Sequence, residues 1–328
     1  MTHSIIRVSL TLVAACLGIA TAMPGAWAQS DRLSFLHAGE ERHYFITLPD
    51  RLVAPDGGVP LVLVLHGAGG NGPNVMAMTR FDEKADEEGF IAVFPEGTPR
   101  DRLVGETLLL TWNAGHCCGY SMRRGADDIG FISALIDELT SEYSIDLNRI
   151  YIAGMSNGGM MTHRLAIALS DRIAAIGTVV GAMFGDEAAP SSPVSAIIFN
   201  AALDDMIPLE GGEIGARFFQ NAWDGTPLAP SDYQGTYWAT ANGCETKPRF
   251  VERKPLYAMS AYECPQGVDV RYYVVEDNGH AWPGDTRITP LGRDATDDFS
   301  ATDVIWDFFA QHQLVIPADE TKPAPASE

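Results

Sequence analysis

Apolar residues along this chain form short continuous runs separated by stretches with helical spacing. Leu61–Leu65, Phe90–Phe94 and Ile150–Ala153 are uninterrupted runs, which is typical of strands covered on both faces. Arg42–Leu48 alternates polar and apolar residues and predicts an earlier strand. The same reasoning predicts three later strands: Ile173–Val180, Ala196–Phe199 and Val268–Val275.

Between these runs, apolar residues recur every three or four positions. Asp127 or Asp128 begins the clearest such stretch and predicts a capped helix. Gly158–Leu169 and Ala301–His312 predict two further helices. Because strands and helices alternate, we expect a single-domain α/β protein with a mostly parallel central sheet flanked by helices.

The two ends of the chain differ from the rest. Residues 1–28 combine a basic start with the apolar stretch Val8–Ala22 and an Ala-x-Ala pattern, which predicts a signal peptide cleaved after Ala28. An alternative is a lipoprotein acylated at Cys16. Residues 316–328 are charged and rich in proline, so we expect a disordered tail after a catalytic domain of residues 29–315. No stretch is long and apolar enough to predict a membrane span, so export to the periplasm or the medium is expected.

The overall charge narrows the range of partners. The 328 residues contain 43 Asp and Glu against 22 Lys and Arg, which gives a formal net charge of −21. Such an acidic protein repels phosphate, so nucleic acid is not an expected partner. The acidic residues are expected to form a solvated surface.

Export changes the interpretation of the cysteines, because disulfides form in oxidising compartments. Without Cys16, four cysteines remain, which permit three pairings. A Cys244–Cys264 bridge, closing a loop of about 20 residues, is the preferred pairing. Cys117 and Cys118 would then form either a vicinal disulfide or free thiols. A zinc site is the alternative, but the ligand spacing typical of zinc is absent.

Residues 154–158 read Gly-Met-Ser-Asn-Gly and match the pattern Gly-x-Ser-x-Gly. This pattern places a nucleophilic serine on a sharp turn between a strand and a helix, where glycines leave room for the turn. The predicted strand Ile150–Ala153 precedes the pattern and a predicted helix follows it. Ser156 is therefore the candidate nucleophile.

A serine hydroxyl needs a base, and the base needs an acid. In this arrangement the acid and the histidine follow the serine in chain order, each after a later strand. Asp204 and Asp205 both follow the strand Ala196–Phe199, and His280 follows Val268–Val275. His280 is the predicted base, and either aspartate is available as the acid.

The loop after an early strand should stabilise the oxyanion with backbone N–H groups. His66-Gly67-Ala68-Gly69-Gly70 directly follows Leu61–Leu65. The predicted donors are the amides of Asn157 and of Gly67 or Ala68. His66 is expected to hold this loop rather than to transfer a proton.

Four strings together resemble the esterase/polyhydroxybutyrate-depolymerase family, which includes bacterial feruloyl and acetylxylan esterases of carbohydrate esterase family 1. The strings are residues 66–70 (HGAGG), 112–119 (WNAGHCCG), 154–159 (GMSNGG) and 279–284 (GHAWPG). The resemblance extends from about Phe45 to His312. It implies a secreted α/β-hydrolase in which Ser156 is the nucleophile and His280 the base.

The family pattern around the acid also matches residues 200–208 (NAALDDMIP) and places the triad acid at Asp204. The match departs at Asn200 and Ala201, which keeps Asp205 as a second choice. The family's Asn-Gly-Cys string appears at residues 242–244 and supports the bridge from Cys244 to Cys264.

Together these residues predict a serine esterase that acts by two-step acyl transfer, with Ala68 and Asn157 as oxyanion donors and no metal or organic cofactor. Trp282 and Trp112 lie beside the motifs and are expected to line the substrate pocket, although Trp112 and Tyr120 are equally compatible with packing on the scaffold. Asp294, Asp297, Asp298 and Asp303 lack the spacing of a calcium loop.

The expected substrates are feruloyl or acetyl esters of plant polysaccharide. The alternatives are a depolymerase of short-chain polyhydroxybutyrate or its oligomers, and a binding protein that keeps the fold without catalysis.

Overall fold

The computed structural model describes residues 31–50, 57–99, 109–215, 222–285, 287 and 295–315. The predicted signal peptide with Cys16 and its cleavage after Ala28, the predicted tail and Asp294 lie outside the described residues.

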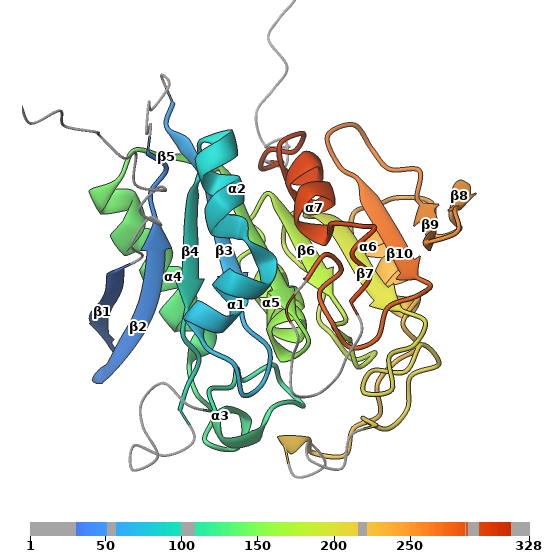
Figure 1. The fold of residues 1–328 in the computed structure, drawn as a ribbon, viewed down its shortest axis with the longest axis horizontal. Helices are drawn as coiled ribbons and strands as arrows, with labels where there is room; N and C mark the ends of the chain where they lie inside the picture. The colour runs from blue at the N-terminus through green and yellow to red at the C-terminus, as the bar shows by residue number, and fades with distance from the viewer. Residues whose placement is uncertain are drawn as a thin grey trace, which may run out of the picture.

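In this part of the chain, ten strands form one sheet in the order β1-β2-β4-β3-β5-β6-β7-β10-β9-β8 (Figure 1). The pairs from β4 to β10 are parallel, whereas the pairs at both edges of the sheet are antiparallel. The strands are β1 (Asp31–His37), β2 (Glu40–Thr47), β3 (Val59–Leu65), β4 (Ile91–Pro95), β5 (Ile145–Met155), β6 (Ala175–Val179), β7 (Ser195–Ala201), β8 (Phe250–Arg253), β9 (Tyr257–Ala261) and β10 (Val270–Val275).

Helices cover both faces of the sheet, and each face has its own apolar core. α4 (Asp128–Glu142), α5 (Asn157–Ala168) and α6 (Tyr233–Ala241) contribute to one core. α1 (Gly72–Thr79), α2 (Phe81–Glu88) and α7 (Ala301–Phe309) contribute to the other. The short α3 (Gly119–Arg123) lies among the loops below the sheet in Figure 1.

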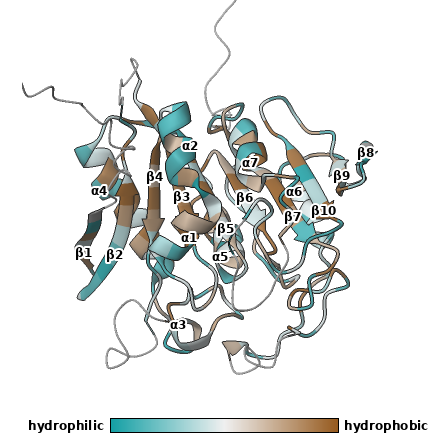
Figure 2. Ribbon diagram, viewed as in Figure 1, coloured by the Kyte–Doolittle hydropathy of each residue, from teal (hydrophilic) through white to brown (hydrophobic). Residues whose placement is uncertain are grey.

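The central strands are hydrophobic along their whole length, as Figure 2 shows for β3 and β4. All seven residues of β3 and all five of β4 are buried. Burial on both faces explains why these strands read as continuous apolar runs rather than as alternating patterns. The predicted α/β-hydrolase fold and its mostly parallel sheet are confirmed.

Other elements differ from the sequence prediction. α6 was not predicted, because it lies in the glycine- and tryptophan-rich segment between Gly211 and Gly243, and its Trp238 is fully buried. α1 was not predicted because its sequence begins with Gly-Pro, but Asn71 caps it and the proline occupies its first turn, where the helix needs no backbone donor. The antiparallel pair β8–β9 was also missed.

Parallel strands place their carboxyl ends at one edge of the sheet, which is where open α/β sheets carry their sites. The segments after β3, β5, β7 and β10 therefore meet at this edge (Figure 1). They carry the candidate oxyanion loop, the candidate nucleophile, the candidate acid and the candidate base.

Candidate active site

Ser156 occupies a strained turn between β5 and α5. Its φ of 55° and ψ of −123° lie in a region that residues with a Cβ rarely adopt. The turn is held because the Ser156 N–H donates to the Val179 carbonyl at 2.9 Å. A Cβ at Gly158 would come within 2.4 Å of the Leu65 carbonyl oxygen and 2.5 Å of the His66 carbonyl oxygen. Glycine at this position therefore lets α5 approach the end of β3.

His280 links Ser156 to Asp204. The Nε2 atom of His280 lies 2.8 Å from the Ser156 Oγ, and its Nδ1 atom lies 2.8 Å from Asp204 Oδ2. A carboxylate at Nδ1 favours the tautomer with its proton there, which leaves Nε2 free to accept the serine proton. The side chains of His280 and Asp204 are 6% and 1% exposed, so water competes little with this relay.

Asp204 is itself held by the backbone. Its second carboxylate oxygen accepts from the N–H groups of Met206 at 2.8 Å and Ile207 at 2.9 Å. Asp205 is exposed. Of the two carboxylates that the sequence offered, the structure brings Asp204 to His280.

Asn278 supports the histidine turn and was not singled out from the sequence. Its amide nitrogen donates to the carbonyls of Gly279 and Ala281, both at 2.9 Å, and its oxygen accepts from the Thr296 N–H at 3.0 Å. The side chain is fully buried. A polar residue two positions before the candidate base was the only sequence signal for this role.

The loop after β3 lies directly against the serine. A Cβ at Gly67 would lie 3.4 Å from the Ser156 Cβ, and Ala68 and Asn157 line the same pocket as Ser156. His66 fixes this loop, because its Nδ1 donates to the Gly67 carbonyl at 2.8 Å and its Nε2 accepts from the Gly97 N–H at 3.0 Å. Burial lowers the pKa of His66 to about 4, which keeps the ring neutral, as these two bonds require.

Trp112 does not line the pocket. It is fully buried, and its indole N–H donates to the His66 carbonyl at 3.0 Å. Its backbone N–H donates to Asn157 Oδ1 at 2.8 Å, and Asn157 Nδ2 donates to its carbonyl at 3.1 Å. The expectation of a substrate contact is corrected here: Trp112 connects the loop after β3 to the start of α5.

Trp282 is also a core residue and does not line the pocket at Ser156. It is 1% exposed, its indole N–H donates to Thr302 Oγ1 at 3.0 Å, and its ring packs edge-on against Phe81. The chain turns inward after His280, so Trp282 ties the histidine turn to α7 on the far side of the sheet. Tyr120 is exposed beside Arg124 and lies outside the pocket lining.

A small apolar pocket opens at Ser156, with a cavity of about 20 Å³. Cys117 and Cys118 are joined as a vicinal disulfide and form part of its wall. The structure also joins Cys244 to Cys264, the pairing preferred from the sequence. The residues lining the pocket are Ala68, Cys117, Cys118, Ser156, Asn157, Met160, Met206, Ile207, Ile214 and His280.

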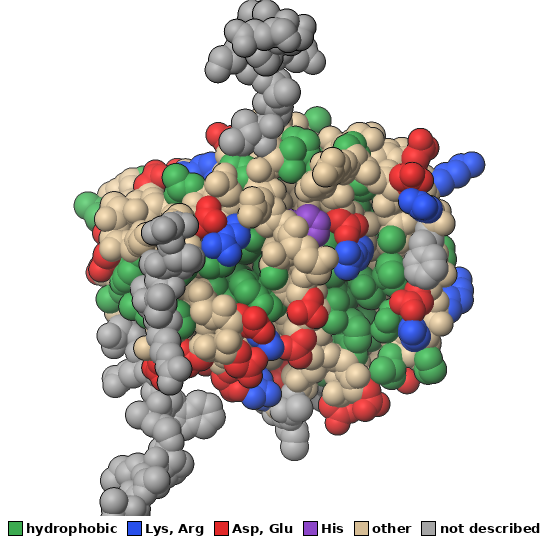
Figure 3. Space-filling model, turned by 90° about the horizontal axis from the view of Figure 1, so that it is seen from above, with side chains coloured by type: hydrophobic (Ala, Val, Ile, Leu, Met, Phe, Trp, Pro, Cys, Tyr) green, Lys and Arg blue, Asp and Glu red, His purple; other side chains and the backbone are tan. Residues whose placement is uncertain are grey.

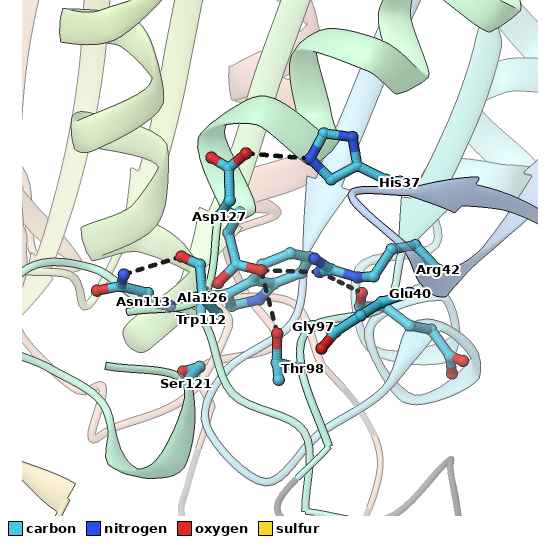
Figure 4. Close-up of polar contacts among 12 residues, drawn as sticks. His37, Glu40, Arg42, Gly97, Thr98, Trp112, Asn113, Ser121, Ala126 and Asp127 are labelled. Carbon is cyan, nitrogen blue, oxygen red and sulfur yellow. Dashed lines mark hydrogen bonds and ion pairs between the residues drawn. The ribbon is translucent and has the colours of Figure 1, made fainter. Parts of the chain in front are cut away.

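A buried ionic network lies behind Trp112. Asp128 accepts from Arg42 at 2.8 Å through one oxygen and from the Asn113 N–H at 2.7 Å through the other. Asn113 also donates through its side chain to the Ala126 carbonyl at 2.9 Å (Figure 4). The Arg42 guanidinium stacks 3.9 Å above the Phe131 ring. This network fixes the segment that holds Asn157.

Two histidines outside the relay have structural partners. His163 is buried between Gln234 and Trp238, and His312 bonds to the Phe308 carbonyl in the last helix. Among the residues that the structure describes, no group of three or more His, Cys, Asp or Glu side chains could hold a metal ion. Asp303, one of the acidic residues near α7, pairs with Lys84.

The described helices include none with the length and apolar character needed to cross a membrane. On the face shown in Figure 3, acidic and basic side chains are interspersed with hydrophobic ones.

A serine, histidine and aspartate presented from the carboxyl ends of parallel strands define a protein of the α/β-hydrolase class. The family model described as "Esterase PHB depolymerase" matches residues 44–210. The chain therefore belongs to this family of carboxylic ester hydrolases.

Individual relatives agree with this assignment. The chain is 26% identical to the bifunctional acetylxylan esterase/xylanase XynS20E of Neocallimastix patriciarum, over 84% of this chain and 33% of that protein. It is 28% identical to feruloyl esterase B of Piromyces equi, over 75% of this chain and 43% of that protein. The chain thus spans less than half the length of these two relatives.

A solved structure shows the same fold. The acetyl xylan esterase from Aspergillus awamori superposes with a TM-score of 0.55 at 16% identity, covering 82% of this chain and 94% of that one.

Proposed function

We propose that this protein is an exported serine esterase that hydrolyses acetyl or feruloyl esters of plant polysaccharide. The observation that carries the proposal is the continuous relay from Ser156 through His280 to Asp204, with 2.8 Å at each of its two contacts. Membership of the esterase family and the similarity to acetylxylan and feruloyl esterases support the substrate class.

In the proposed mechanism, Ser156 Oγ attacks the ester carbonyl carbon while His280 Nε2 takes the hydroxyl proton. Asp204 stabilises the imidazolium that forms and does not itself take up the proton. When the carbonyl bond re-forms, the alcohol leaves and receives this proton from His280. Water then attacks the acyl-enzyme by the same steps, which releases the acid and restores the serine.

The negative charge on the carbonyl oxygen needs donors that are in place before the reaction. The proposed donors are the backbone N–H groups of Ala68 and Asn157, two residues that line the same pocket as the serine. Asn157 is the first residue of α5, so the positive end of the helix dipole adds to the stabilisation. No step requires a metal ion or an organic cofactor.

The size of the pocket favours acetyl among the proposed acyl groups. A cavity of about 20 Å³ holds little more than one water-sized group. The apolar wall around it suits a methyl group better than a charged one.

The direct test measures acid release by the purified mature protein and by Ser156→Ala. Acetylated and feruloylated arabinoxylan are the polysaccharide substrates, and emulsified polyhydroxybutyrate is the competing substrate. Acetate or ferulate that depends on Ser156 supports the proposal. Release of 3-hydroxybutyrate alone would instead assign a depolymerase, the activity in the family description.

The intact relay also separates this proposal from a non-catalytic binding role. A fluorophosphonate probe labels an activated serine, so labelling of the wild type but not of Ser156→Ala is expected. A wild-type protein that does not react would favour the binding role.

The proposal of export rests on residues 1–28. The mature N-terminus is expected at Gln29 and can be read by N-terminal sequencing of protein from the periplasm or medium. A mature chain that begins at a lipid-modified Cys16 would support the lipoprotein alternative.

A further inference from the structure

A second, larger cavity lies beside α5, close to the pocket at Ser156. Its volume is about 280 Å³, compared with about 20 Å³ at the serine. It is bounded by α5, by the segment after β6 and by the loop that leads to the vicinal disulfide. Its lining includes Ile129, Met160, Arg164, Ile167, Met183 and Phe184.

The cavity extends along α5 from the first turn after the nucleophile. Met160, Arg164 and Ala168 line it at intervals of four residues, and Ser156 lies four residues before Met160. Residues four apart are neighbours on a helix surface, so Met160, Arg164 and Ala168 form one row along α5. Ser156 and Ala168 are about 18 Å apart along the helix axis. We call the cavity along this row the α5 groove.

Met160 is the residue that belongs to both cavities. It lines the pocket at Ser156 together with Cys117 and Ile207, and it lines the α5 groove together with Met183. Its backbone N–H donates to the Ser156 carbonyl at 2.9 Å, so it stands one turn beyond the nucleophile. Helical side chains lean toward the N-terminus, which directs Met160 back toward the serine.

The charged groups at the α5 groove already have partners. Arg164 bonds to the carbonyl and the side-chain oxygen of Asn113. His116 bonds to Asp186 and Asp224, and Glu187 accepts backbone N–H groups of residues 184 and 185. The surface left for a ligand is therefore mainly apolar, formed by isoleucine, methionine, alanine and phenylalanine side chains. An uncharged alkyl or aryl group fits it better than a sugar or an anion.

We propose that Met160 sets the acyl length by separating the pocket at Ser156 from the α5 groove, and that the α5 groove accepts longer apolar acyl chains once this side chain is removed. This inference rests on the proposed esterase function and adds the residue that sets acyl length. With Met160 in place, a two-carbon acyl group fits beside the serine and longer chains are disfavoured. Without its side chain, the two cavities join and the acyl chain can extend along α5.

The test compares p-nitrophenyl acetate with p-nitrophenyl octanoate in the wild type, Met160→Ala and Met160→Leu. The measured quantity is the ratio of kcat/KM for octanoate to that for acetate. We expect this ratio to rise about tenfold or more in Met160→Ala, because several methylenes gain an apolar site. Met160→Leu keeps a bulky side chain and should keep the wild-type ratio.

A second variant tests whether the acyl chain lies in the α5 groove. Ala168 is exposed at the far end of the row, so Ala168→Trp should fold and shorten the groove. In the Met160→Ala background it should lower kcat/KM for p-nitrophenyl dodecanoate while the value for octanoate stays the same. Met160→Val, which removes less volume, should give an intermediate ratio if Met160→Ala is too unstable to assay.

An octanoate-to-acetate ratio in Met160→Ala within about twofold of the wild type would overturn the proposal. An equal loss for octanoate and dodecanoate on adding Ala168→Trp would also overturn it. Failure of the proposed serine-esterase chemistry looks different, since the wild type would then hydrolyse none of these esters, whereas a different natural substrate is detected by the polysaccharide and polyhydroxybutyrate assays.

Discussion

Asn157 holds the backbone of Trp112 from both sides: its Oδ1 accepts the Trp112 N–H at 2.8 Å, and its Nδ2 donates to the Trp112 carbonyl at 3.1 Å. The same tryptophan holds the His66 carbonyl through its indole N–H. One buried residue thus contacts both segments that carry the proposed oxyanion donors. The distance between these donors depends on Trp112.

Replacing Trp112 by phenylalanine removes the indole donor and keeps an aromatic ring. We expect kcat to fall about ten- to a hundredfold with little change in KM. The reason is that misplaced oxyanion donors weaken the stabilisation of the transition state, where the negative charge develops, and hardly affect substrate binding. Steady-state kinetics with p-nitrophenyl acetate measure both constants.

Trp238→Phe is the matched control for Trp112→Phe. Trp238 is equally buried and also loses an indole hydrogen bond, to His163, but it lies in α6 away from the serine. Trp238→Phe should lower the melting temperature by about as much as Trp112→Phe does and leave kcat unchanged. Equal effects of the two variants on kcat would contradict a positioning role for Trp112.

The choice between the neighbouring aspartates can be tested directly. Asp204→Asn should lower kcat by about four orders of magnitude, because an amide at Nδ1 no longer favours the productive histidine tautomer. Asp205→Asn makes the same chemical change one residue later, at an exposed side chain, and should retain most of the activity. A larger loss in Asp205→Asn than in Asp204→Asn would reverse the assignment.

Two buried histidines predict a loss of stability in acid. Burial lowers the pKa of His66 and of His163 to about 4, whereas an unfolded chain has a histidine pKa near 6.5. Between these values the unfolded chain binds more protons, so the free energy of unfolding decreases as the pH falls.

Each histidine contributes to the free energy of unfolding by up to about 3 kcal/mol. This contribution is fully present above about pH 6.5 and is lost as the pH falls toward 4. Urea unfolding at several pH values between 4 and 7 measures the slope. His163→Gln should reduce the slope by about half, and an unchanged slope in this variant would contradict the assignment to His163.

The Cys244–Cys264 bridge closes a loop with a sequence separation of 20 residues. Replacing both cysteines by serine should lower the free energy of unfolding by about 3 kcal/mol, chiefly because the unfolded chain gains freedom. Urea unfolding of the two proteins at neutral pH checks this value. Because the bridge lies outside the pocket lining, kcat should be retained at temperatures where the variant is folded.

The sequence predicted the central sheet well because its strands are buried on both faces and appear as apolar runs. The edge pair β8–β9 was missed because its residues are only partly buried and lack such a run. α6 was hidden in a segment rich in glycine and tryptophan, where tertiary packing of Trp238 outweighs local preference.

The candidate nucleophile and base could be placed because each stands directly after a strong strand. The acid remained ambiguous from the residues alone, because the turn after β7 decides which of two adjacent side chains faces His280. The tryptophans beside the motifs were harder still. A tryptophan beside a catalytic motif can line a pocket or pack in the core. The orientation of Trp112 and Trp282 depends on contacts with residues far away in the sequence.

The close approach at Gly158 limits how this protein can change. Because any side chain there would collide with the carbonyl oxygens of Leu65 and His66, the nucleophile and the oxyanion loop meet backbone to backbone. This contact contains no side chain, whereas the pocket wall at Met160 includes side chains that can be replaced. Substitutions in the pocket wall can therefore change which substrates are accepted, while the backbone contact between the nucleophile and the oxyanion loop is kept.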